Sequence, residues 1–107
     1  MKVNVLGERY EVIESNCAED LTLAGASDGY CDHTTKSIVI DTFKPSDDSL
    51  GDLERYRKQV IRHELVHAFL FESGLSGNSW AKDEEIVDWI ANQFPKLQAA
   101  FAQCNAV

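Results

Sequence analysis

The chain has 107 residues and a formal net charge of −8, with 44% hydrophobic and 26% charged residues. This length predicts a single domain, residues 1–107, with a small but real core. The acidic balance argues against nucleic-acid binding, which needs clustered lysine and arginine to neutralise phosphates. No apolar run approaches the roughly 20 residues that cross a bilayer, and no long apolar segment typical of a secretion signal follows Met1.

The cysteines indicate a reducing compartment. The number of cysteines is odd, and none of the three, Cys17, Cys31 and Cys104, belongs to a Cys-x-x-Cys pair. Free thiols are therefore expected and not a disulfide framework. The sequence therefore predicts a cytoplasmic protein that does not associate with membranes.

The first third of the chain predicts β-strands. Two short strands are expected on either side of a turn at residues 7–9, marked by Val3, Val5, Tyr10, Val12 and Ile13. Residues 14–28 predict a loop and residues 29–32 lead into a turn. Residues 36–41 are rich in β-branched side chains and predict a third strand.

A long helix is expected next. Residues 45–49 break the strand pattern, and Ser49 is expected to cap a helix that runs from about Leu50 to about Ser73. Gly74, followed by the apolar Leu75, suits a left-handed cap at the end of that helix.

A second helix should follow and run back across the first. Ser79 is its expected cap, and its end is predicted near Gln103. Pro95 removes a backbone donor, so it should kink this helix or begin a new one. Strands followed by helices define an α+β domain.

One stretch of the first helix has the residues of a metal site. His63 and His67 are four residues apart, so on a helix their side chains lie on the same face. Both imidazoles can therefore reach one zinc ion at the roughly 2.0–2.1 Å of a zinc–nitrogen bond. Glu64 lies beside that face, where it can reach a water molecule without binding the metal. This HExxH pattern predicts Zn2+ as the cofactor and Glu64 as the general base.

The surroundings of the motif argue against a chance match. HExxH occurs by chance in many proteins, but here residues 60–71 are apolar except for Arg62 and the three motif residues. Such a helix is expected to be buried, and burying polar groups without partners is costly. A metal ion with its surrounding hydrogen bonds would satisfy them. Arg62 is expected to pair with a nearby carboxylate.

The second helix is expected to supply a third ligand, since hydrolytic zinc sites usually have three protein ligands and one open position. Glu84 is preferred, and Glu85 is the alternative. Asp88 lies one turn after Glu84 and can accept the second ring N–H of a ligand histidine, which fixes the tautomer. The equivalent position for Glu85 is Trp89, which cannot accept that bond. We therefore predict His63, His67 and Glu84 as the metal ligands.

These residues resemble the gluzincin clan of metallopeptidases. Residues 63–67, His-Glu-Leu-Val-His, match the clan's HExxH motif. Residues 83–88 are similar to its glutamate-helix motif Glu-x-x-x-Asp, with Asp83 where many members have asparagine. More narrowly, residues 29–32, 38–41 and 89–96 resemble small phage- and prophage-encoded metallopeptidases and the ImmA/IrrE-type proteases of Gram-positive bacteria.

The resemblance implies a minimal zincin-like domain, in which a three-stranded sheet precedes the active-site helix and the glutamate helix. It implies that strand 36–41 is the edge strand beside the cleft and pairs with an extended protein or peptide substrate. Larger gluzincins stabilise the oxyanion with a downstream histidine or tyrosine that has no clear match here. Tyr30, His33 and Tyr56 are the candidates.

The sequence thus predicts a zinc metalloendopeptidase that hydrolyses peptide bonds, with a role in phage biology. Two alternatives stay open at this point. One is a zinc-binding regulatory or interaction module of phage origin with little or no turnover, and the other is a structural protein whose zinc clamps two helices. A structural site would be closed by four protein ligands. The pattern supplies three, and Glu64 would then have no reason to be acidic.

Overall fold

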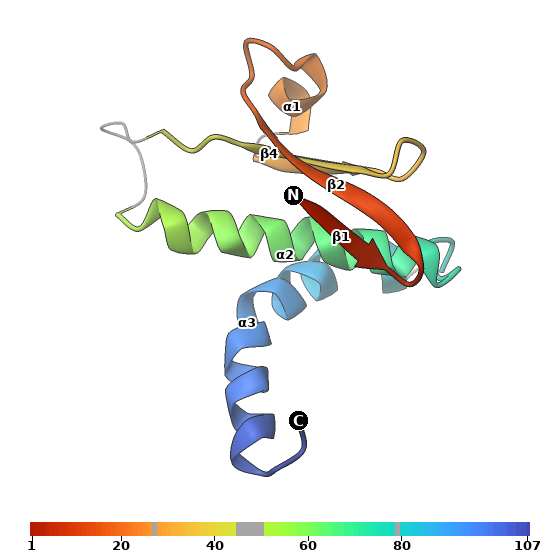
Figure 1. Ribbon diagram of the computed structural model, residues 1–107, viewed down its shortest axis with the longest axis vertical. Helices are drawn as coiled ribbons and strands as arrows, with labels where there is room; N and C mark the ends of the chain where they lie inside the picture. The colour runs from red at the N-terminus through yellow and green to blue at the C-terminus, as the bar shows by residue number, and fades with distance from the viewer. Residues whose placement is uncertain (27, 45–50, 79) are drawn as a thin grey trace.

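The computed structural model describes residues 1–26, 28–44, 51–78 and 80–107 and has an α+β fold. One mixed sheet lies over the long helix α2, and the first turns of α3 lie beneath α2 (Figure 1). The elements in chain order are β1 (Lys2–Val5), β2 (Glu8–Ser15), α1 (Leu21–Ala26), β3 (Gly29–Asp32), β4 (Ser37–Asp41), α2 (Leu53–Glu72), the 3-10 helix η1 (Trp80–Lys82) and α3 (Glu84–Gln103).

The sheet differs from the predicted three-stranded one. Its four strands have the order β1-β2-β4-β3, with β2 and β4 parallel and the two outer pairs antiparallel. The additional strand is β3, which is too short at four residues to show an alternating pattern in the sequence. The expected edge position of residues 36–41 is wrong, because β4 lies between β2 and β3. The edge strand on this side of the sheet is β3.

The predicted loop at residues 14–28 is also corrected. Strand β2 extends through Ser15, and α1 follows, with the carboxylate of Asp20 accepting a hydrogen bond of 3.0 Å from the backbone N–H of Leu23. Leu23 is fully buried, and α1 contacts β3 and β4. A six-residue helix has too few turns to show a periodic apolar pattern.

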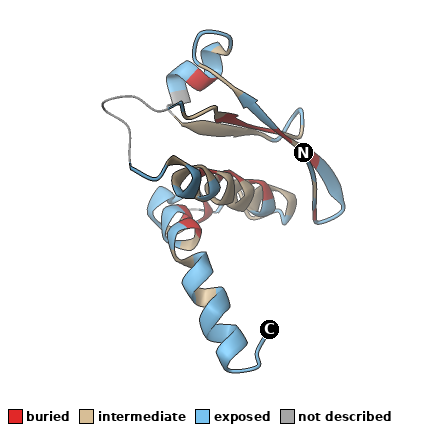
Figure 2. Cartoon of the chain, turned by 60° about the vertical axis from the view of Figure 1, so that its left-hand side comes forward, coloured by how far each residue is buried: buried red, intermediate tan, exposed pale blue. Residues whose placement is uncertain are grey.

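The core lies between the sheet and α2. Alternate residues of the strands face the helix, as the period of two in a β-strand requires. The buried cluster consists of Val5, Tyr10, Val12, Ile38, Ile40, Val60 and Ala68. Figure 2 shows that the buried segments face one another across this layer, while the far half of α3 is exposed. Helix α2 therefore has one buried stripe and is not buried on all sides as its apolar sequence had suggested.

Both ends of α2 carry capping interactions. The helix begins at Leu53, where the carboxylate of Asp52 accepts a hydrogen bond of 3.0 Å from the N–H of Arg55. The expected cap Ser49 and start Leu50 lie outside the described residues.

At the other end of α2, the left-handed cap at Gly74 is confirmed, with a φ of +80° that favours glycine. The N–H groups of Gly74 and Leu75 donate to the carbonyls of Phe71 and Leu70, each at 3.0 Å. These two bonds form a Schellman motif.

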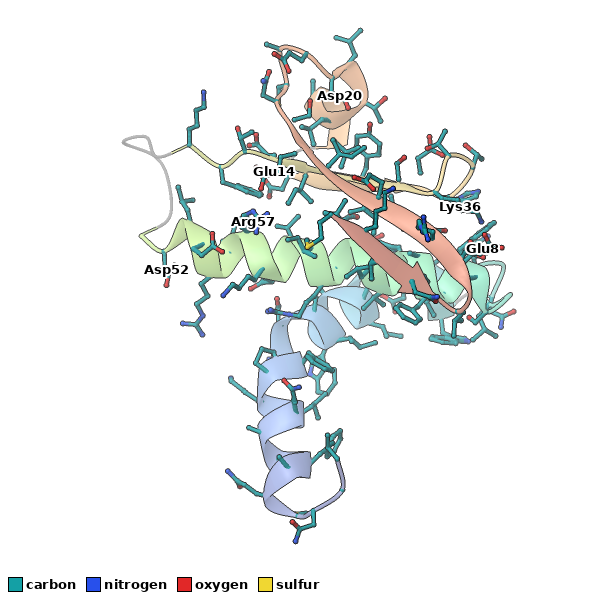
Figure 3. All side chains as sticks on the ribbon, viewed as in Figure 1. Glu8, Glu14, Asp20, Lys36, Asp52 and Arg57 are labelled. Atoms are coloured by element: carbon teal, nitrogen blue, oxygen red, sulfur yellow. The ribbon has the colours of Figure 1, made fainter. Side chains whose placement is uncertain are left out.

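Polar and close contacts fix the sheet on α2 at several points. Near the start of the helix, Arg57 pairs with Glu14 of β2 at 2.6 Å (Figure 3). At its end, Glu72 accepts hydrogen bonds from Tyr10 of β2 and Lys36. Between them, Gly29 of β3 approaches α2 so closely that an added Cβ would lie 3.0 Å from Val60 Cγ1. The edge strand is thus held against the helix that carries the HExxH motif.

Helix α3 begins at Glu84, where the side chain of Asp83 accepts a hydrogen bond of 2.9 Å from the N–H of Glu85. The expected cap Ser79 lies outside the described residues. The helix continues through Pro95, so no new helix begins there, and it ends at Gln103 as predicted. Its second half projects away from α2 (Figure 1). None of the helices described is long and apolar enough to cross a membrane.

Candidate metal centre

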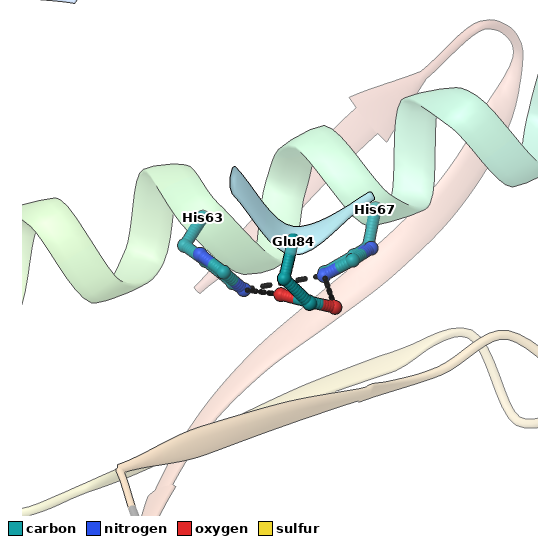
Figure 4. Close-up of side chains that lie close together, drawn as sticks. All are labelled: His63, His67 and Glu84. Atoms are coloured by element: carbon teal, nitrogen blue, oxygen red, sulfur yellow. Dashed lines mark hydrogen bonds and ion pairs between the residues drawn. The ribbon is translucent and has the colours of Figure 1, made fainter. Parts of the chain in front are cut away.

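Two helices bring three potential metal ligands together (Figure 4). His63 and His67 project from successive turns of α2, and their Nε2 atoms are 3.2 Å apart. Glu84, in the first turn of α3, reaches both histidines: Oε2 lies 3.0 Å from Nε2 of His63 and Oε1 lies 3.1 Å from Nε2 of His67. One ligand atom from each residue lies within 4.8 Å of the others, so this group can hold a metal ion.

Asp88 lies one turn after Glu84 and fixes the orientation of His63. Its Oδ1 is 2.7 Å from Nδ1 of His63, on the far side of the ring from the other ligands. In the neutral imidazole, an N–H at Nδ1 that donates to this carboxylate leaves the lone pair on Nε2. That nitrogen is the one that faces Glu84 and His67. The tautomer with its proton on Nδ1 would therefore be held by Asp88 and would present Nε2 to a metal.

Glu64 is the one buried charged residue among those that the structure describes, with 5% of its surface exposed. Burial raises the pKa of its carboxyl to about 7; His63 opposes this rise, and the nearby carboxylates Glu84 and Asp88 reinforce it. The cause is the cost of holding a charge away from water. Glu64 is not part of the cluster of His63, His67 and Glu84, and it lines the same two cavities as His63.

Two cavities meet at His63 and Glu64. The larger, of about 750 Å³, is open to solvent and is also lined by residues of the edge strand β3, the end of α2 and the segment that leads into α3. The smaller, of about 180 Å³, continues on the other side of Glu64 toward Asp28, Tyr56 and Asp88. Gly29, the first residue of the edge strand, lines both cavities, and Tyr30 and Cys31 of the same strand line the larger one.

The three residues considered for the oxyanion all line the cleft, but two of them are engaged elsewhere. The hydroxyl of Tyr30 donates to Asp20 at 2.8 Å, and that of Tyr56 donates to Asp28. His33 stacks on Phe71, with ring centroids 3.9 Å apart, and lines the larger cavity. Of the three, His33 is therefore the one that makes no hydrogen bond or ion pair with a carboxylate among the described residues, although its charge acts on Glu72.

The structure separates the two carboxylates that the sequence left open as third ligand. Glu84 joins the cluster, whereas no ion pair involves the exposed Glu85 within the described parts of the chain.

Two contributions to the site were not predicted from the sequence. Arg62 donates to the backbone carbonyl of Ala91 at 2.6 Å and not to a carboxylate, and Gly29 sets the distance between β3 and α2. For Gly29, the available signal in the sequence was a glycine at the start of a short apolar stretch.

Comparison with known proteins gives no match: no family model, no curated protein and no solved structure is similar to this chain. The resemblance to gluzincins therefore stays a prediction from the motif residues.

Proposed function

We propose that this protein is a zinc-dependent metallopeptidase. The observation that carries the proposal is the position of Glu64, a buried carboxylate at the junction of two cavities and beside a cluster of two histidines and a glutamate. A metal that only clamped α2 to α3 would need no such group, and burying a carboxylate is costly. The cost is explained if the carboxylate moves a proton during a reaction.

The donor set fits zinc. Two ligands at the roughly 2.0–2.1 Å of zinc–nitrogen bonds are roughly 3.3 Å apart in a tetrahedral site, and the two Nε2 atoms lie 3.2 Å apart. Imidazole nitrogen with one carboxylate is a ligand set typical of catalytic zinc. A zinc ion bound by His63, His67 and Glu84 would polarise a substrate carbonyl and acidify a water molecule.

The residues around the ligands have separate roles in peptide hydrolysis. Glu64 takes the proton of the attacking water on its carboxylate and delivers it to the amine that leaves. Asp88 accepts a hydrogen bond from Nδ1 of His63 and so orients the ring with Nε2 toward the metal position. The edge strand β3 offers backbone groups along the cleft, so an extended protein or peptide substrate would pair with it by strand addition. The cytoplasmic and phage setting remains a prediction from the free cysteines and the resemblance.

The decisive experiment is Glu64→Gln, with Glu85→Gln as the matched control on an exposed glutamate. Zinc-loaded wild-type protein and both variants would be incubated with a diverse peptide library and products identified by mass spectrometry. We expect Glu64→Gln to lose hydrolysis by at least about 10²-fold while keeping one zinc per chain, and Glu85→Gln to match wild type. Loss of zinc from Glu64→Gln would instead make Glu64 a ligand. Zinc binding by wild type without any cleavage would favour the regulatory module.

A further inference from the structure

A backbone carbonyl in α3 has lost its partner within the helix. Pro95 has no N–H, so the carbonyl of Ala91, four residues earlier, cannot receive the usual helical hydrogen bond. Ala91 is 1% exposed, so water does not readily replace that bond. The side chain of Arg62 on α2 does so: its Nε donates to this carbonyl at 2.6 Å. The side chain of Arg62 on α2 thus replaces the hydrogen bond that Pro95 removes from α3.

This bond lies on the stripe of α3 that carries the metal site. Glu84, Asp88 and Ala91 are spaced by four and three residues, so they occupy one face of the helix. On α2, Arg62 directly precedes His63, to which both Glu84 and Asp88 are bonded. Three successive turns of α3 are therefore tied by polar contacts to one turn of α2. Apolar packing contributes beside these contacts, through the buried side chains of Val87 and Ala91.

We propose that Arg62 is a positioning residue: by occupying the carbonyl that Pro95 leaves free, it sets the crossing of α3 over α2 and thereby the placement of Glu84 and Asp88 at the histidines. Without Arg62, the buried carbonyl can regain a partner only by turning toward water, since an unpaired buried acceptor is unfavourable. That movement carries Asp88, one turn away, from His63. The effect on metal binding rests on the proposed function, whereas the positioning of Asp88 does not.

The test is a double-mutant cycle between Arg62→Met, whose unbranched side chain reaches the position of Nε but has no donor there, and Pro95→Ala, which restores the missing N–H. Arg57→Met is the control, since Arg57 is on the same helix but pairs with Glu14 on the sheet. Two readouts are taken: the ring ¹⁵N shifts of His63 in the metal-free protein, which report its Nδ1 hydrogen bond, and the zinc dissociation constant by chelator competition.

We expect Arg62→Met to lose the Nδ1–H signature and to bind zinc at least about tenfold more weakly. The double variant should recover the signature and return to within about threefold of wild type, because the helix then satisfies its own carbonyl. A double variant as impaired as Arg62→Met, or an Arg62→Met variant that matches Arg57→Met, would overturn the proposal. If wild type binds no zinc but the ¹⁵N cycle shows rescue, the positioning role stands and the proposed function fails.

Discussion

The most informative perturbation of the site is removal of the carboxylates of α3 one at a time, by Glu84→Ala, Asp88→Ala and Glu85→Ala. Glu84 contacts both histidines at 3.0 and 3.1 Å, Asp88 contacts only the outer nitrogen of His63 at 2.7 Å, and Glu85 contacts neither. The three variants lose the same kind of charge from adjacent positions on one helix. Differences between them therefore report geometry and not overall electrostatics.

The expected losses of zinc affinity follow from these contacts. A zinc site with four ligands binds with about 10–16 kcal/mol, so one ligand contributes roughly 2.5–4 kcal/mol, and Glu84→Ala should weaken binding about 10²–10³-fold. A hydrogen bond to a charged group contributes about 1.5–3 kcal/mol when shielded. The side chain of Asp88 is 60% exposed, so the lower figure applies and its loss should cost about tenfold. For Glu85→Ala we expect less than about twofold.

Competition with a chromophoric chelator at fixed pH and ionic strength would measure the three dissociation constants. The order Glu84→Ala, Asp88→Ala, Glu85→Ala from weakest to tightest is the prediction. If Glu85→Ala lost the most affinity, the register of α3 against α2 would differ by one residue. The assignment of Asp88 to His63 would then be wrong as well.

Three further outcomes test the fold around the site. Gly29→Ala should lower the free energy of unfolding by about 1–3 kcal/mol in urea titrations, because the new Cβ meets Val60 at 3.0 Å; Gly25→Ala, with no neighbour within 4 Å, should not. The hydrogen bond from Lys36, and to a lesser extent that from Tyr10, lowers the pKa of Glu72. The ionised Glu72 therefore stabilises the fold above its unfolded pKa of about 4.3, and this stabilisation is lost as the pH falls below that value. The stability gap between wild type and Glu72→Gln should accordingly narrow between pH 6 and pH 3, about the range of that titration, and a constant gap would refute the assignment. Chelation of zinc should raise hydrogen exchange in α3 more than in the sheet, and a uniform rise would contradict a site located between α2 and α3.

The two long helices and the clustering of His63, His67 and Glu84 could be predicted because their signals are local. A spacing of four places His63 and His67 on one face whatever the rest of the chain does, and Gly74 after a polar serine marks a helix end by its own conformational freedom. The preference for Glu84 over Glu85 also used helical spacing alone, through the position of Asp88. In each case the deciding interactions join residues within one or two turns.

The sheet could not be predicted in full, because its order depends on pairings between distant residues. Nothing local distinguishes β3 from a turn, since its four residues gain their hydrogen bonds from β4 across the sheet. The predicted edge position of residues 36–41 was wrong for the same reason, because β4 pairs in parallel with β2 after a crossover. Arg62 illustrates a third limit: its partner is a backbone carbonyl made available by a proline 33 positions further along the chain.

The arrangement of charge at the site ties the metal to the docking of α3. Glu64, Glu84 and Asp88 gather three carboxylates around two histidines in a chain that already carries a net charge of −8. Their mutual repulsion opposes the approach of α3 to α2, and it is one cause of the raised pKa of Glu64. A divalent cation reverses the sign of that interaction, because the same carboxylates then attract a common positive charge. If the cluster binds such a cation as proposed, metal binding and helix docking would favour each other by linkage, and Glu84 would be held in place most firmly in the metal-bound protein.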